Sequence, residues 1–110
     1  MKVDESSEQL SGVFAALGDA TRLHLVHRLQ AGQPQSIAQL SQGLSLSHQG
    51  VTKHLRVLEN AGLVGAQKVG REKRYWGNAK QIGAARSYLD QVAAQWDVAL
   101  LRLKQHVEKD

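Results

Sequence analysis

Apolar residues recur at intervals of three and four along most of the chain, the spacing that lines one face of an α-helix. The pattern predicts a first helix over residues 7–17 and a second over 20–30, with Asp19 placed as the N-cap of the second. Gly32 and Pro34 then break the chain into a turn. The apolar face of the second helix is expected to consist of Leu23, Leu25, Val26 and Leu29.

A short third helix is expected next. Ser36 and Gln39 have the spacing of a capping box, and Gly43 can close the helix. Another helix begins only a few residues later, so the two form a helix-turn-helix pattern. The inward-facing residues of the short helix are expected to be Ile37, Leu40 and Leu44.

The fourth helix begins after the N-cap candidate Ser47 and ends before Gly62, where helices commonly close with a left-handed residue. Val51, Leu55 and Leu58 recur at i, i+4 and i+7, so they form one apolar stripe along it. This stripe predicts which side of the helix faces the core.

The opposite face of the fourth helix carries hydrogen-bonding groups and positive charges, and no acid precedes Glu59. This profile is typical of a helix in a DNA major groove, where such side chains meet base edges and phosphates. On this helix alone, an ordinary amphipathic helix with a solvated polar face remains the alternative. The candidate base-reading residues are His48, Gln49, Thr52 and Lys53, and the candidate phosphate contacts are Ser47 and Arg56.

After Gly62 the pattern changes to β-branched and aromatic residues on either side of a glycine-containing turn, which predicts a β-hairpin. Its strands are expected over Leu63–Lys68 and Lys73–Trp76. A plain surface hairpin would more often mix the two signs of charge, so we favour a basic wing that touches phosphates or the minor groove. The positive residues, set against the single acid Glu72, are Lys68, Arg71, Lys73 and Arg74.

The helical period returns over residues 79–107 and forms a heptad-like seam. A small domain cannot cover so long an apolar face, which indicates a partner helix, and self-association is the simplest choice. The seam consists of Ile82, Ala85, Leu89, Val92, Trp96, Ala99 and Leu103.

Composition narrows the possible classes of protein. The chain has 110 residues, 42% of them hydrophobic, which is typical of one globular domain, and its net charge of +4 favours a polyanionic partner. The lack of cysteine excludes disulfides and thiolate metal sites. The first residues are too polar for a signal peptide, and no apolar run is long enough for a bilayer, so we expect a soluble, cytoplasmic protein.

Three motifs make the chain similar to the ArsR/SmtB-type winged-helix repressors. They are Leu17–Arg22 at the entry to the second helix, Leu44–Val64 over the recognition helix and its exit, and Val69–Tyr75 in the wing. The resemblance covers nearly the whole chain from about residue 10. It implies a homodimeric DNA-binding repressor that dimerises through its first and last helices. The expected interface residues are Leu10, Phe14, Leu89, Val92, Trp96 and Leu103.

The fold class expected on these grounds is mostly α: a winged helix-turn-helix with a two-stranded hairpin wing and a long C-terminal dimerisation helix. A single domain is expected over residues 1–110. Its expected parts are dimerisation helices at 7–17 and 79–107, a helix-turn-helix at 36–60 and a wing at 63–77.

The chain departs from the metal-sensing members of this family. Ser36 and Ala38 stand where those members carry a cysteine pair, and neither can replace a thiolate. His24 and His27 could share a ligand face, although such a pair is more often plain polar surface. The last helix lacks the Asp-x-His and His-x-x-Glu spacing of zinc-binding members and resembles the branch that ends in a helix containing a tryptophan, here Trp96. We therefore expect no metal and no cofactor, and the effector is left open. The acids and histidine of the last helix are Asp90, Asp97, His106 and Glu108.

The leading hypothesis is a sequence-specific repressor that binds double-stranded DNA at an inverted repeat, with half-sites about 10 bp apart or a multiple of it. The alternative is a winged-helix module for protein docking or dimerisation without DNA. Lys53 and Arg56 argue against it, because docking faces are depleted of lysine. No Ser/His/Asp constellation, paired carboxylate or phosphate-binding glycine loop supports an enzyme.

Overall fold

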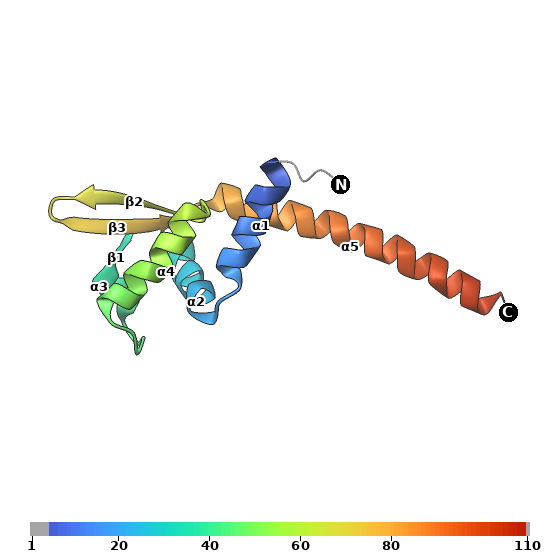
Figure 1. The fold of residues 1–110 in the computed structure, drawn as a ribbon, viewed down its shortest axis with the longest axis horizontal. Coiled ribbons are helices and arrows are strands. Elements are labelled where there is room, and N and C mark those ends of the chain that lie inside the picture. The colour runs from blue at the N-terminus through green and yellow to red at the C-terminus, as the bar shows by residue number, and fades with distance from the viewer. Residues whose placement is uncertain (1–4, 110) are drawn as a thin grey trace.

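The computed structural model describes residues 5–109 and is mostly helical, with a small sheet near one end (Figure 1). The element order agrees with the expected series of helices, hairpin and long final helix. The elements are α1 (Glu5–Leu17), α2 (Ala20–Arg28), the 3₁₀ turn η1 (Leu29–Ala31), β1 (Gln35–Ser36), α3 (Ile37–Ser41), α4 (His48–Asn60), β2 (Val64–Val69), β3 (Glu72–Gly77) and α5 (Ala79–Glu108).

The expected helix starts are confirmed by their caps. A side-chain oxygen of Asp19 accepts the backbone N–H of Arg22 at 3.1 Å, which satisfies a free donor in the first turn of α2. Ser36 and Gln39 form the reciprocal capping box of α3, with bonds of 3.2 and 2.9 Å. At the far end of α4, Gly62 adopts a φ of 76°, the left-handed region that glycine enters without strain.

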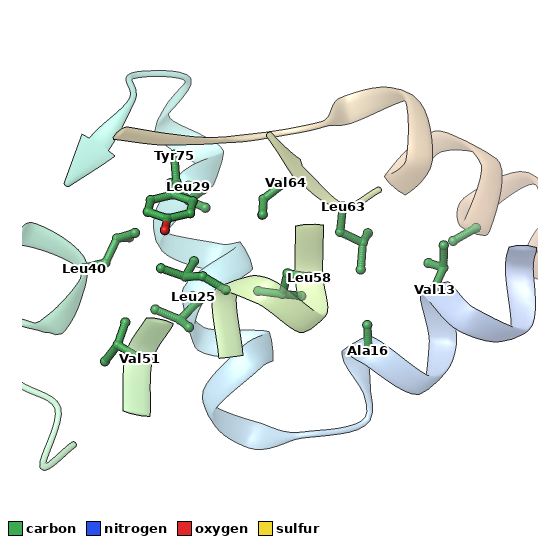
Figure 2. Packing of buried hydrophobic residues seen from close by; sticks show 12 residues of the cluster. Val13, Ala16, Leu25, Leu29, Leu40, Val51, Leu58, Leu63, Val64 and Tyr75 are labelled. Atoms are coloured by element: carbon green, nitrogen blue, oxygen red, sulfur yellow. The ribbon is translucent and has the colours of Figure 1, made fainter. Parts of the chain in front are cut away.

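The core lies where α2, α3 and α4 meet the sheet, and Figure 2 shows side chains from these elements converging on it. The apolar stripe of α4 is completely buried, as expected. Burial of a leucine or valine of this kind contributes about 1.5–3 kcal/mol. The fully buried residues include Leu25, Leu40, Val51, Leu55, Leu58, Leu63 and Tyr75.

The sheet has a third strand that the sequence pattern did not predict. The strand order is β1-β3-β2, all antiparallel, and Gln35 and Ser36 of β1 pair with Tyr75 and Arg74 of β3. A strand of two residues is too short to display an alternating pattern, so the stretch after Pro34 was expected only as a turn. The strand ties the base of the hairpin to the start of α3.

The second helix also differs from expectation. It ends at Arg28 and continues as the 3₁₀ turn η1. Leu23, expected on its apolar face, is 53% exposed. The reason is geometric, because Leu23 and the buried Leu25 are two residues apart and therefore point to nearly opposite sides of a helix.

The last helix determines the shape of the molecule, whose extents are 69 × 31 × 22 Å. Its first turns pack against α1, where Ala85 is buried and the rings of Phe14 and Tyr88 lie 5.8 Å apart. Beyond this contact α5 runs away from the rest of the chain (Figure 1). No helix in residues 5–109 has both the length and the apolar content to cross a membrane.

Candidate nucleic-acid interface

The exposed face of α4 brings together the residues of this helix that were predicted from the sequence to contact DNA. The buried stripe on the other side of the helix holds this face outward. Most of its side chains are exposed, and Thr52 is half-buried. The residues that line one shallow surface hollow along it are His48, Gln49, Thr52, Lys53 and Arg56.

Two hydroxyl groups at the start of α4 are already hydrogen-bonded within the helix. Ser47 Oγ accepts the backbone N–H of Gly50 at 3.1 Å, so it is the N-cap and its own O–H stays available to an acceptor such as a phosphate oxygen. Thr52 Oγ1 donates to the carbonyl of His48 at 2.7 Å. Its lone pairs and methyl group are therefore what Thr52 can offer to a base edge.

A polar network that the sequence did not predict holds α4 against the junction of α1 and α2. Arg22 Nη1 lies 3.3 Å from His54 Nδ1, and Asp19 Oδ2 lies 3.8 Å from the same nitrogen. Arg22 Nε also donates to the carbonyl of Ala16 at 2.6 Å. The N–H bond from Arg22 holds the pKa of the Asp19 carboxyl below its usual value of 3.8, and the nearby His54 and Arg22 charges act in the same direction.

Arg28 positions the other half of the helix-turn-helix. Its guanidinium donates to the carbonyls of Gln39, Leu40 and Gln42 at the end of α3, with 2.9 Å to Leu40. The carbonyl of Gln39 also accepts the backbone N–H of Gln42 at 3.3 Å. Carbonyls at the end of a helix lack the usual partners of the helix interior, and a planar donor can satisfy several at once. A cation in the last turn of α2 was visible in the sequence, but nothing there indicated its partners on α3.

The register of the wing separates its cations onto two faces. Lys73 lies two residues before the buried Tyr75 on β3, so both side chains point to the same face of the sheet. Lys68 is the direct cross-strand partner of Lys73 and therefore lies on that face as well. Arg74 lies on the opposite face. The four cations that the sequence grouped together therefore do not form one surface.

Two of these wing cations are held by acids of the same chain. Lys73 Nζ lies 3.5 Å from a carboxylate oxygen of Glu59, at the end of α4. Arg74 Nε lies 3.0 Å from Glu72 Oε1. Within the described part of the chain, no carboxylate lies within 4 Å of the cations of Lys53, Arg56, Lys68 or Arg71.

The wing ends in a two-residue turn, Gly70–Arg71, between the paired residues Val69 and Glu72. Gly70 has a φ of 65° and Arg71 does not have a positive φ, the sign pattern of a type II′ hairpin turn. The exposed Arg71 side chain therefore lies at the tip of the wing.

The outer part of α5 exposes the seam residues expected at a dimer interface. Trp96 is 63% and Leu103 is 59% exposed, and Leu89 is exposed as well. Leu10, Phe14 and Val92 are half-buried.

Residues 5–109 contain no group of three His, Asp or Glu side chains arranged to hold a metal ion. His24 and His27, the pair that could have shared a ligand face, lie exposed on α2.

Known proteins share both the sequence and this arrangement. Residues 17–64 match the family described as a helix-turn-helix domain. The chain is 33% identical over 97 residues to the HTH-type transcriptional regulator Rv2034 of Mycobacterium tuberculosis, covering 88% of this chain and 87% of the regulator. It is 38% identical to the ArsR-like transcriptional regulator from Rhodococcus sp. RHA1, with a TM-score of 0.76 over 89% of this chain and 92% of that structure.

A third comparison concerns the fold alone. The solution structure of the homodimeric winged helix-turn-helix DNA-binding domain Mb0332 from Mycobacterium bovis is 22% identical, with a TM-score of 0.65 over 88% of this chain and 91% of that domain. The fold, the helix-turn-helix match and the relatives that align over nearly the whole chain lead to the same conclusion. The chain belongs to the ArsR family of winged helix-turn-helix, DNA-binding transcriptional regulators.

Proposed function

We propose that the protein is a homodimeric transcriptional repressor whose two α4 helices enter the major groove at the halves of an inverted-repeat operator. The observation that carries the proposal is the exposed face of α4, where polar and cationic side chains line one hollow and no acid occurs before Glu59. A recognition helix presents such a face to base edges. The turn of the wing then lies near phosphates or the minor groove.

The proposed roles follow from position and from existing partners. Lys73 and Arg74 receive a smaller share of the phosphate contacts, because each is paired with an acid in the free protein. Base edges are assigned to His48, Gln49, Thr52 and Lys53, and phosphates chiefly to Ser47, Arg56, Lys68 and Arg71.

The homodimer is proposed from the exposed apolar length of α5 and is supported by the homodimeric Mycobacterium bovis domain of the same fold. A second copy that covers Leu89, Trp96 and Leu103 would remove a large apolar surface from water. The two-fold axis of such a dimer requires an operator with half-sites about 10 bp apart or a multiple of it.

We also infer that metal ions do not control this repressor. Ser36 caps α3 with its hydroxyl, and Ala38 has no donor atom. Neither offers the thiolate that soft and borderline metals prefer. The histidines of α2 lie without an acid arranged to complete a site in the described part of the chain.

The decisive experiment selects genomic fragments with the purified full chain and measures operator binding across a salt series. We expect an enriched inverted repeat and an affinity that falls steeply with salt. Lys53→Ala should cost about 1–3 kcal/mol per lost base contact and reduce the preference for operator over scrambled DNA. Lys104→Ala removes the same charge from α5, next to Glu108, and should leave that preference intact.

Two results would contradict the proposal. If the full chain retains no fragment in a salt-dependent manner, the alternative role as a protein-docking module takes precedence. If Lys104→Ala and Lys53→Ala alter operator preference equally, α4 is not the helix that reads the bases.

A further inference from the structure

A cleft lies on the molecule away from the DNA-facing side of α4, where α2 and η1 meet the end of the wing and the start of α5. It encloses about 270 Å³. Its floor reaches the core, because Leu29 and Leu63 are buried beneath it and Val26 is half-buried. Ile82, 38% exposed, forms an apolar rim on α5.

The lining of the cleft carries no charge. Apart from the four aliphatic side chains it consists of the amides of Gln30 and Asn78 and of small residues. The chain as a whole has 14 Lys and Arg and 10 Asp and Glu, and the hollow along α4 is lined by Lys53 and Arg56. An apolar floor with a few amides at its edge suits an uncharged molecule, since burial of an unpaired charge there would be costly.

The size of the cleft suits a small organic molecule. An engineered apolar protein cavity of about 150 Å³ binds benzene. A volume of about 270 Å³ therefore accommodates one or two rings. A smaller uncharged hollow between Phe14 and Tyr88 lies on the α1–α5 surface that we assign to the second copy, and its volume is about 160 Å³.

One residue of the cleft joins three parts of the fold. The backbone N–H of Asn78 donates to the carbonyl of Leu63 at 2.8 Å, and its side-chain amide donates to the carbonyl of Gly62 at 2.9 Å. Its side-chain oxygen accepts the N–H of Lys80 at 3.1 Å and caps α5. A molecule against Asn78 and Leu63 would thus contact the link between α4, the wing and the dimerisation helix.

We propose that this cleft binds an uncharged, largely apolar small molecule of one or two rings, and that its occupation regulates DNA binding. The regulatory half rests on the proposed function. In a dimer held by α5, the link at Asn78 and the packing of α1 on α5 together set the separation of the two α4 helices. A ligand that favours another angle lowers operator affinity through its differential affinity for the two arrangements.

The binding half is tested without DNA. The amide spectrum of the ¹⁵N-labelled full chain is titrated with benzyl alcohol, and in parallel with benzoate and benzylammonium, which have similar size but opposite charges. We expect saturable shifts at Gln30, Gly32, Gly77 and Ile82 with benzyl alcohol, and binding of either ion that is weaker by roughly tenfold or more.

Three outcomes would overturn the site. The first is no saturable shift at these amides up to the solubility of benzyl alcohol. The second is equal affinity for all three probes, or shifts centred on the apolar surface around Trp96, which would indicate general adsorption. The third is that dilution of the protein alone moves the same amides, because a side chain of the second copy would then be the occupant.

Variants that fill the cleft provide the matched control. Val26→Trp and Ile82→Trp place a ring into it from opposite sides, whereas Leu23→Trp adds the same ring to α2 outside it. We expect the first two to abolish the benzyl alcohol shifts and the third to retain them. Ile82 lies exposed at the rim, so we expect its variant to fold even if the half-buried Val26 does not tolerate the change. Unaltered shifts in folded Ile82→Trp would contradict the proposed site.

The regulatory half is tested by operator affinity with and without saturating benzyl alcohol. We expect a change of about 5–150-fold in the unaltered protein and in Leu23→Trp, and none in Ile82→Trp. If benzyl alcohol binds at the cleft without any change in operator affinity, the proposed regulation is wrong, whereas the proposed binding site still stands. If the protein binds no DNA at all, the proposed function fails, whereas the spectral titration still decides whether the cleft is a site.

Discussion

The tip of the wing offers the sharpest test of how the protein meets DNA. Arg71 lies at the turn with no acidic partner within the described residues, whereas Arg74 is paired with Glu72 on one face of the same hairpin. A cation without an acidic partner has no ion pair to break before it neutralises a phosphate and releases the counterion bound there. Arg71→Ala should therefore lower the salt dependence of DNA binding, on operator and random duplexes alike.

The expected magnitude follows from the number of cations without an acidic partner. Each protomer has three such cations that are assigned to phosphates, and if each neutralises one phosphate, a dimer gives a slope of log K against log salt of about −5.4. Arg71→Ala removes two contacts per dimer and changes the slope to about −3.6. A rise from 50 to 200 mM salt should then weaken binding about 10²-fold in the variant instead of about 10³-fold. The three cations are Arg56, Lys68 and Arg71.

Fluorescence anisotropy of labelled operator and scrambled duplexes, over a salt series, measures these slopes. Two controls separate contact from net charge. Arg86→Ala removes one charge per protomer from α5, where Arg86 lies 4.0 Å from Asp90, and should leave the slope unchanged. The double variant Glu72→Gln/Arg74→Gln removes the exposed ion pair without changing net charge, and its slope should also be nearly that of the unaltered protein.

The reasoning is refuted if Arg86→Ala reduces the slope as much as Arg71→Ala, since only the net charge would then matter. It is also refuted if Arg71→Ala changes the preference for operator over scrambled DNA while the slope stays the same. In that case the tip reads bases and does not contact phosphates.

The remaining predictions concern assembly, packing, metals and acid stability. Leu103→Glu places an unpaired charge in the exposed seam of α5 and should give monomers in analytical ultracentrifugation. Gly65→Ala sets a Cβ 2.5 Å from the Trp76 ring and should cost about 1–3 kcal/mol in urea unfolding, whereas Gly83→Ala, in open space, should stabilise α5 by about 1 kcal/mol. Low-micromolar zinc should leave operator affinity within about twofold, well below the 5–150-fold of allosteric control. The pKa of Asp19 is lowered on folding, so its ionised carboxylate stabilises the protein above pH 3.8, and this contribution disappears as the pH falls through the lowered pKa. The stability difference between the unaltered protein and Asp19→Asn should therefore change mainly between pH 3.8 and the lowered pKa.

Most of the helices were predictable because their core-facing residues recur with a helical period in the sequence, although this period misplaced Leu23 of α2. Val51, Leu55 and Leu58 lie on one stripe, and packing buries that stripe completely. The caps were predictable for a similar reason, since Ser36 and Ser47 act on neighbours only three residues away. Information of this kind is local, so it survives without knowledge of the fold.

What could not be predicted depends on contacts between distant residues. Arg28 and Gln42 meet only after α2 and α3 have packed, and no local pattern marks that pair. The same is true of Arg22 and His54. The face on which each wing cation lies follows from the register of the hairpin, and the register depends on the turn at Gly70. A list of basic residues therefore could not divide the cations between the two faces.

The short strand β1 has a consequence for the order of folding. The packing of α3 and α4 involves neighbours in the chain, whereas Gln35 and Ser36 must find Tyr75 and Arg74 across a loop that contains both helices and β2. Closing a long loop costs entropy before any pairing compensates it, so local contacts form first. In native-state hydrogen exchange we expect the β1–β3 pairing to open at lower free energy than the middle of α4. The proposed recognition helix α4 would then pack against α3 before β1 pairs with β3 at the base of the wing.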